Sequence, residues 1–159
     1  MAKELVIERI FDAPIEKVWR AWTEPEQFKK WWGPKNFTAP TINIDLRVGG
    51  KYLWCMHGKA APDQAAGDFW NTGEYKEIVP MKKLVYTNCF ADKDGNVVPS
   101  TAYGMPGFDD EGLVTVVFED MSGKTKITVR HAGLPEGMLS EMTGLGWNQS
   151  FDKMVESLQ

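Results

Sequence analysis

The sequence predicts an α+β fold in which a curved antiparallel sheet of six or seven strands packs against a long C-terminal helix. Segments between residues 37 and 133 alternate apolar and polar side chains, whereas residues 134–159 repeat apolar side chains at helical spacing. A short helical pattern also follows the first strand directly. With 159 residues the chain has the length of one domain, which we expect to span residues 1–159.

The N-terminal part predicts one strand followed by two short helices. Residues 3–11 alternate apolar and charged side chains, as in a half-buried strand. The next helix begins near Pro14 and places apolar residues at i, i+3, i+4 and i+7. Thr23 and Glu26 have the spacing of a capping box for a second helix, which we expect to end at Gly33 and Pro34.

Six further segments carry strand patterns bounded by turn residues. They cover residues 41–50, 51–58, 69–80, 82–92, 112–120 and 124–133. Their consecutive order predicts an antiparallel meander. The segment 41–50 is expected to end at the pair Gly49 and Gly50, after an apolar face that continues to Leu46 and Val48.

The last segment predicts a long amphipathic helix. Its main apolar stripe consists of Trp147, Phe151, Met154, Val155 and Leu158. Gly144 and Gly146 separate this stripe from an upstream one and favour a bend or a close approach to another surface. Because a convex helix seldom fills a sheet that curls around it, we expect a hydrophobic cavity between the two.

Composition excludes several classes of function. The 18 basic and 22 acidic residues give a net charge of −4 and form no basic run that suits nucleic acid. No segment is long and apolar enough to span a membrane, and the N-terminus lacks the apolar core of a signal peptide. Cys55 and Cys89 have no metal or redox spacing, so we expect buried free thiols and a cytoplasmic protein.

An ordered set of motifs resembles a known family. Several segments are similar, in order, to the activator-of-heat-shock-protein-ninety ATPase homologue-like (AHSA-type) domain. They are "DAPIEKVWRAWTEPEQFKKWWGP", "RVGGKY", "GEYKEIVPMKKLVYT", "TVVFED" and "TVRHAGLP", followed by "GW", "FDKM" and a final Leu. That family belongs to the START-like, or SRPBCC, helix-grip superfamily, which includes the birch pollen allergen. The resemblance covers residues 4–158 and implies the helix-grip fold.

The resemblance implies three alternative functions. Single-domain relatives are presumed to bind small apolar ligands or to act in stress responses. We therefore expect a non-enzymatic domain that binds an apolar or aromatic small molecule. A co-chaperone module that acts on the heat-shock-protein-ninety ATPase, and a cyclase- or hydrolase-like enzyme that uses the cavity, are the alternatives.

The expected cavity-lining residues are mostly aromatic. They are Trp32, Trp54, Met56, Tyr75, Tyr86, Asn88, His131, Trp147 and Phe151. The amide of Asn88 either orients a ligand or bonds to the backbone or a trapped water. His131 shares the inward parity of its strand and either acts as an acid or base or fixes the turn into the last helix. His57 has the opposite parity and is expected to face water.

No assembled catalytic set, metal site or cofactor motif is expected. The segment "DKDGN" (92–96) resembles the opening of a calcium loop but has Tyr103 where the last acidic ligand belongs, so it predicts a turn. The neighbours Trp31 and Trp32 share a helical side with Phe28. We expect one to seal the core and the other to stand at the cavity rim, and the sequence leaves open which.

Overall fold

The computed structural model describes residues 3–59 and 62–159, and in these ranges it has seven strands, three α-helices and one 3-10 helix. Their bounds are β1 (Lys3–Phe11), α1 (Ile15–Thr23), α2 (Pro25–Phe28), β2 (Thr38–Ile44), β3 (Lys51–Gly58), β4 (Gly67–Val79), β5 (Lys83–Ala91), η1 (Ser100–Tyr103), β6 (Gly112–Met121), β7 (Lys124–Leu134) and α3 (Met138–Ser157).

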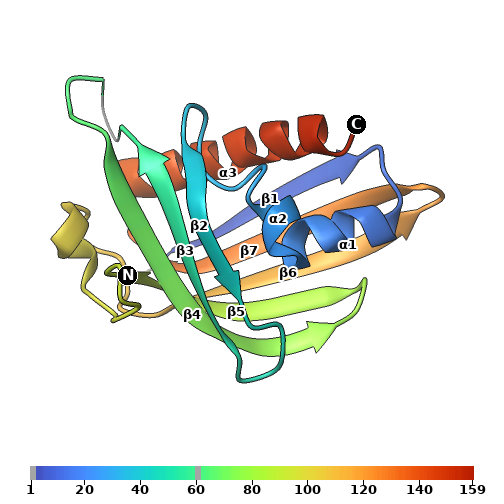
Figure 1. Cartoon of the computed structure of the whole chain (residues 1–159), viewed down its shortest axis with the longest axis horizontal. Helices are drawn as coiled ribbons and strands as arrows, with labels where there is room; N and C mark the ends of the chain where they lie inside the picture. Colours follow the sequence, from blue (N-terminus) through green and yellow to red (C-terminus); the bar gives the residue numbers. More distant parts are fainter. Residues whose placement is uncertain (1–2, 60–61) are drawn as a thin grey trace.

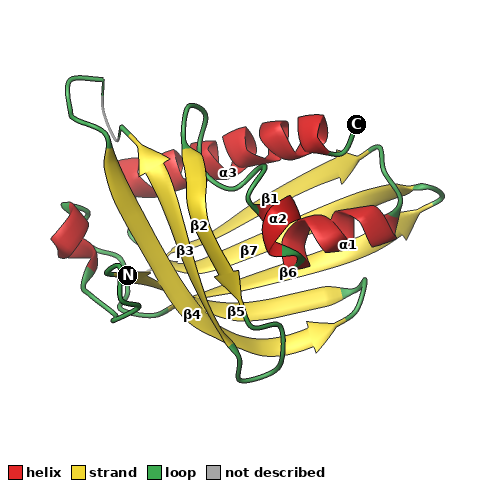
Figure 2. Cartoon of the chain, viewed as in Figure 1, coloured by secondary structure: helices red, strands yellow, loops and turns green. Residues whose placement is uncertain are grey.

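The seven strands form one antiparallel sheet in the order β1-β7-β6-β5-β4-β3-β2. β1 reaches the edge beside β7, and the remaining strands follow as a meander. The sheet curves around α3, which lies along its concave side (Figure 1). The helices α1 and α2 lie near one end of the sheet, and η1 lies near the opposite end (Figure 2). This is the predicted helix-grip arrangement.

Gly73 helps the sheet to curl tightly. A Cβ atom at this position on β4 would lie 1.9 Å from the carbonyl oxygen of Thr87 on β5, which no side chain tolerates. Only glycine therefore allows the two backbones to approach this closely. A register shift between Tyr75 and Glu77 follows in the same strand pair. Bulges of this kind bend a strand and increase its twist.

The core is an aromatic cluster between the sheet, the two short helices and the C-terminal half of α3. Trp22 on α1 lies 4.8 Å from Trp31 and 6.3 Å from Phe151, measured between ring centroids. Phe28 on α2 lies 4.5 Å from Trp54 on β3. All five side chains are at most 1% exposed. Rings of this size account for much of the apolar area that a small domain can bury.

The predicted capping box is wrong. Thr23 is the last residue of α1, and its hydroxyl donates to the carbonyl of Trp19 at 2.9 Å, so it cannot cap the next helix. Glu24 occupies the N-cap of α2 without a side-chain bond. The second helix also ends at Phe28, before the predicted Gly33 and Pro34. The chain continues in turns whose amides at Trp31 and Trp32 both bond to the Phe28 carbonyl.

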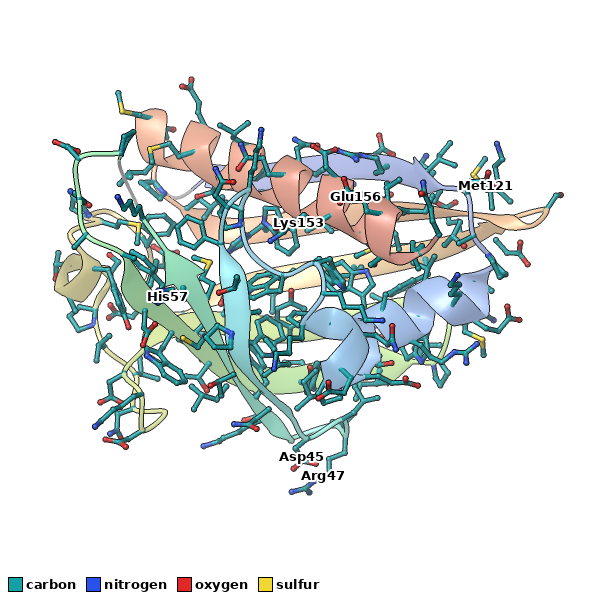
Figure 3. The ribbon with its side chains drawn as sticks, turned by 45° about the horizontal axis from the view of Figure 1, so that its top comes forward. Asp45, Arg47, His57, Met121, Lys153 and Glu156 are labelled. Carbon is teal, nitrogen blue, oxygen red and sulfur yellow. The ribbon has the colours of Figure 1, made fainter. Side chains whose placement is uncertain are left out.

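The predicted strand 41–50 is shifted toward the N-terminus. β2 begins at Thr38 and ends at Ile44, and Leu46 and Val48 are 39% and 64% exposed in the following loop. The amide of Gly50 donates to the carbonyl of Arg47, which closes a tight turn. Figure 3 shows Asp45 and Arg47, which form an ion pair of 2.9 Å, at the tip of this loop. The alternation of apolar and polar residues continues to Val48 in the sequence, but the strand ends at Ile44 because the chain turns after it.

Several simpler predictions are confirmed. Cys55 and Cys89 are buried free thiols. The segment 92–96 is a turn in which the carboxylate of Asp92 accepts hydrogen bonds from the amides of Asp94 and Asn96. These bonds lower the pKa of Asp92. Within the ranges that the structure describes, no helix is both long and apolar enough to cross a bilayer.

Candidate functional site

A pocket of about 410 Å³ lies between the sheet and the N-terminal half of α3. Four parts of the chain form its walls: the loop after α2, the concave face of β3, β4, β5 and β7, the loop that contains η1, and α3 itself. The volume is within the usual range of small-molecule sites. Met142 and Leu145, which are 50% and 59% exposed, form part of the lining and bring the pocket to the surface.

The walls are largely apolar. The sheet contributes Met56, Phe69 and Phe90, and the loop before β6 contributes Met105 and Phe108. The ring of Phe90 lies 5.3 Å from that of Phe108, so the loop packs against the sheet where the two meet. The helix α3 adds Leu139, Met142, Leu145 and Trp147. A lining of this kind favours an apolar guest over a charged one.

Five of the nine predicted cavity residues line this pocket. They are Trp32, Met56, Asn88, His131 and Trp147. The other four, Trp54, Tyr75, Tyr86 and Phe151, lie in the packed core and are at most 1% exposed. Rings from α1 and α2 fill that end of the concave face, so the open space is displaced toward η1. Strand parity alone does not reveal where along a strand the space begins.

The two neighbouring tryptophans have different environments. Trp31 is fully buried, and its indole Nε1 donates to the carbonyl of Ala21 at 2.8 Å. Trp32 is half-buried and lines the pocket, where its ring lies 5.6 Å from that of Trp147. Trp31 therefore seals the core beneath α2, and Trp32 stands at the pocket.

Side chains of α3 fasten the loop that carries Trp32. The ammonium of Lys153, a residue that Figure 3 labels on α3, donates to the carbonyls of Trp32, Pro34 and Phe37 at 3.4, 3.2 and 3.0 Å. The hydroxyl of Ser150 donates to the carbonyl of Gly33 at 2.8 Å. Burial lowers the pKa of Lys153. These bonds fix one wall of the pocket to the helix that forms another.

His131 is the most strongly perturbed titratable group on the pocket lining. Its Nδ1 accepts a hydrogen bond of 3.1 Å from the indole of Trp147, and its Nε2 lies 3.4 Å from the amide of Asn88. Burial lowers the pKa of His131 to about 4, so the ring is neutral near pH 7. Trp147 on α3 and His131 on β7 thus join the helix to the sheet. A neutral histidine can still orient a ligand, although it is a poor acid at this pH.

His57 lies outside the pocket lining. It is exposed on β3, and its Nδ1 lies 2.7 Å from a carboxylate oxygen of Asp68, in agreement with the predicted outward parity. Among the described residues, no group of three or more His, Cys, Asp and Glu side chains could hold a metal ion.

Sequence reasoning missed much of the pocket lining. Phe69 and Phe90 share the inward parity of Asn71 and Asn88, so alternation could have found them. Met105 and Phe108 lie in a loop rich in glycine and proline, where no periodicity indicates which side chain faces inward. Phe108 packs against Phe90 of β5, a contact that only the folded chain forms.

Comparison with solved structures shows the same architecture. Protein CV1439 from Chromobacterium violaceum is 26% identical with a TM-score of 0.78, and the match covers 98% of this chain and 96% of that one. Protein NE0264 from Nitrosomonas europaea is 24% identical with a TM-score of 0.73 and coverages of 98% and 93%. The AHSA1 protein from Silicibacter pomeroyi is 20% identical with a TM-score of 0.74 and coverages of 98% and 97%.

No protein of curated function matches the chain. The family model described as Activator of Hsp90 ATPase homolog 1-like protein matches residues 12–159. This range runs from the turn after β1, through the two short helices and the meander, to the end of the C-terminal helix. The chain therefore belongs to the Activator of Hsp90 ATPase homolog 1-like family.

Proposed function

We propose that this chain is a non-enzymatic, single-domain binding protein of the cytoplasm that holds an apolar or aromatic small molecule between the sheet and α3. The observation that carries the proposal is the pocket of about 410 Å³, whose mainly apolar walls come from four separate parts of the chain. A few polar side chains, among them Asn88 and His131, interrupt these walls. Binding sites for small molecules commonly combine apolar walls with a few polar groups that fix orientation.

The surroundings of His131 support binding rather than catalysis. Both of its ring nitrogens lie within 3.4 Å of another side chain, and its depressed pKa of about 4 keeps it neutral. A general acid or base works best when its pKa lies near the operating pH. The two buried free cysteines fit a reducing compartment such as the cytoplasm.

Calorimetric titration with fluorene, a rigid aromatic hydrocarbon, tests the proposal. Thr143 on α3 is half-buried and lines the pocket, so Thr143→Phe places a ring inside it. We expect this variant to bind fluorene at least tenfold more weakly than the wild type. The matched control is Thr115→Phe, which introduces the same ring on β6 at a residue outside the pocket lining.

The two variants make the result specific to the pocket. If wild type and Thr115→Phe bind fluorene and Thr143→Phe does not, the ligand occupies this space. Equal affinities for all three proteins would place the ligand elsewhere on the molecule. Absence of any heat of binding with the wild type, up to the solubility limit of fluorene, would contradict the proposed function.

A further inference from the structure

The inner end of the pocket, where Asn88 and Trp32 lie, carries hydrogen-bond donors that lack acceptors. We propose that the ligand carries a neutral oxygen that accepts hydrogen bonds, such as a ketone, ester or ether oxygen, and that it inserts this oxygen first, toward Asn88 and Trp32. The inference rests on the proposed function and adds the chemical class of the ligand and its orientation.

Three adjoining rings carry polar hydrogens without an acceptor. Trp32 Nε1, Trp54 Nε1 and Tyr86 Oη are buried and have no hydrogen-bond partner among the described residues. The centroid of Trp54 lies 5.0 Å from that of Trp32 and 5.4 Å from that of Tyr86. An indole N–H can only donate, and a buried donor without an acceptor lowers the stability of the protein. Of the three, Trp32 lines the pocket, whereas Trp54 and Tyr86 lie in the core, so an acceptor that enters the pocket beside Trp32 would recover a hydrogen bond that the unliganded protein lacks.

The hydrogen bonds around His131 determine which of its ring nitrogens carries the proton. Because the indole of Trp147 can only donate, Nδ1 of His131 carries the lone pair, and the neutral ring carries its proton on Nε2. Tyr52 Oη donates its single proton to the carbonyl of Thr87 at 2.7 Å, and the Asn88 atom placed 3.3 Å from it is Oδ1. Asn88 Nδ2 is then placed 3.4 Å from Nε2 of His131, which sets two donors against each other. We therefore assign the amide in the reverse orientation, with its oxygen toward His131 and its nitrogen toward Tyr52, because both neighbours then gain a hydrogen bond.

One amide hydrogen of Asn88 is left without an acceptor at the pocket. The nitrogen of Asn88 has two hydrogens, and Tyr52 accepts only one of them. Asn88 and Trp32 both line the pocket, and Tyr86 lies two residues before Asn88 on the same face of β5. Trp32 and Asn88 therefore each offer a donor without a partner to a ligand in the pocket, which favours a ligand that accepts.

The charges on the pocket lining favour a neutral oxygen. The lysines among the lining residues are Lys35 and Lys59, and both are exposed. No lysine or arginine among the described lining residues reaches the inner end near Asn88. A carboxylate inserted there would lose its hydration without gaining a counter-charge, which is costly in an apolar site. A carbonyl or ether oxygen accepts the same hydrogen bonds without that cost.

Four rigid tricyclic probes of nearly the same shape test the inference by calorimetry. Fluorene has no polar group, fluorenone adds a ketone oxygen, carbazole adds an N–H donor, and fluorene-9-carboxylate adds a charge. We expect fluorenone to bind about tenfold more tightly than fluorene, which corresponds to one hydrogen bond recovered in a dry site. Carbazole should bind no better than fluorene, and the carboxylate should bind more weakly.

Matched variants locate the oxygen. Asn88→Leu should reduce the preference for fluorenone over fluorene to less than about threefold. Asn43→Leu makes the same replacement on β2, at a residue outside the pocket lining, and should leave the preference unchanged. If Asn88→Leu does not fold, Trp32→Phe replaces it, because Trp32 lines the pocket and its indole N–H has no partner among the described residues, so no hydrogen bond within the protein is removed. That variant should fold and lose at least half of the preference.

The possible outcomes separate a failure of the proposed function from a failure of the inferred ligand class. If no probe binds, the proposed function fails and the inference fails with it. If fluorene and fluorenone bind equally, or if carbazole or the carboxylate binds most tightly, the pocket binds ligands but the inferred ligand class is wrong. A preference for fluorenone that survives in Asn88→Leu would contradict the inferred orientation.

Discussion

His131 is a buried residue that both bonds to α3 and lines the pocket. Its ring is 7% exposed and connects Trp147 on α3 to Asn88 on β5. The parity of its strand predicted an inward side chain, but neither bond could be predicted from the sequence. The partner of a buried polar group depends on which side chain folding brings within about 3 Å of it.

The lowered pKa of His131 makes stability depend on pH. Burial lowers this pKa from 6.5 to about 4, so below pH 6.5 the unfolded chain binds a proton that the folded chain does not. Stability therefore falls as the pH decreases from 6.5 to about 4, and the pKa difference corresponds to roughly 3 kcal/mol. Urea unfolding at pH 7 and pH 4 measures this loss.

The variant His131→Gln isolates this contribution, because glutamine does not titrate and its carbonyl can accept from Trp147. Carboxylates that titrate in the same range affect both proteins equally. We expect the wild type to lose roughly 3 kcal/mol more than the variant between pH 7 and pH 4. Parallel losses would show that His131 does not titrate as its burial requires.

At the scale of elements, α3 has two parts with different roles. Its C-terminal half, with Phe151 and Met154, packs into the core, whereas Met142 and Leu145 in the N-terminal half are exposed and line the pocket. The sequence showed this division as two apolar stripes out of phase. It did not show that Lys153 would donate to three carbonyls of the loop after α2, because a lysine in a helix ordinarily faces water.

The substitution Lys153→Met tests the attachment of this loop to α3. Methionine keeps much of the apolar stem and removes the three hydrogen bonds, so we expect stability to fall by about 2 kcal/mol. Hydrogen exchange at the amide of Phe37, which bonds to the carbonyl of Pro34, should accelerate as the loop loosens. The same experiment gives both the stability and the local effect.

Lys17→Met is the matched control, since the ammonium of Lys17 also donates to a backbone carbonyl, that of Leu158 just after α3. It should leave exchange at Phe37 unchanged. If Lys153→Met also left that exchange unchanged, the three bonds would not hold the pocket wall in place.

At the scale of the whole molecule, order and periodicity predicted the architecture, and details of local geometry did not follow from them. The sheet and the long helix were predictable because period two and period 3.6 repeat over many residues. The end of β2 at Ile44 and the end of α2 at Phe28 were not, because each depends on a single turn. The pocket likewise depends on Met105 and Phe108, which reach it from an irregular loop.

The position of the pocket along the concave face depends on where other side chains already fill the space between sheet and helices. Trp54 on the concave face packs against Phe28 of α2, and Phe151 of α3 packs against Trp22 of α1, so side chains fill that end. Farther toward η1, the N-terminal half of α3 and the loop that contains η1 border the pocket. A family fold predicts that a space between sheet and helix can form, whereas the side chains of the individual sequence determine its location.

The most direct test of the central claim is to locate a bound ligand by intermolecular nuclear Overhauser effects between fluorenone and the protein. We predict contacts with the methyl groups of Met56, Leu139 and Ala132 and with the ring of Trp147, all of which line the pocket. Contacts confined to exposed apolar side chains outside it, such as Leu46 and Val48, would contradict the claim that this protein binds its ligand between the sheet and α3.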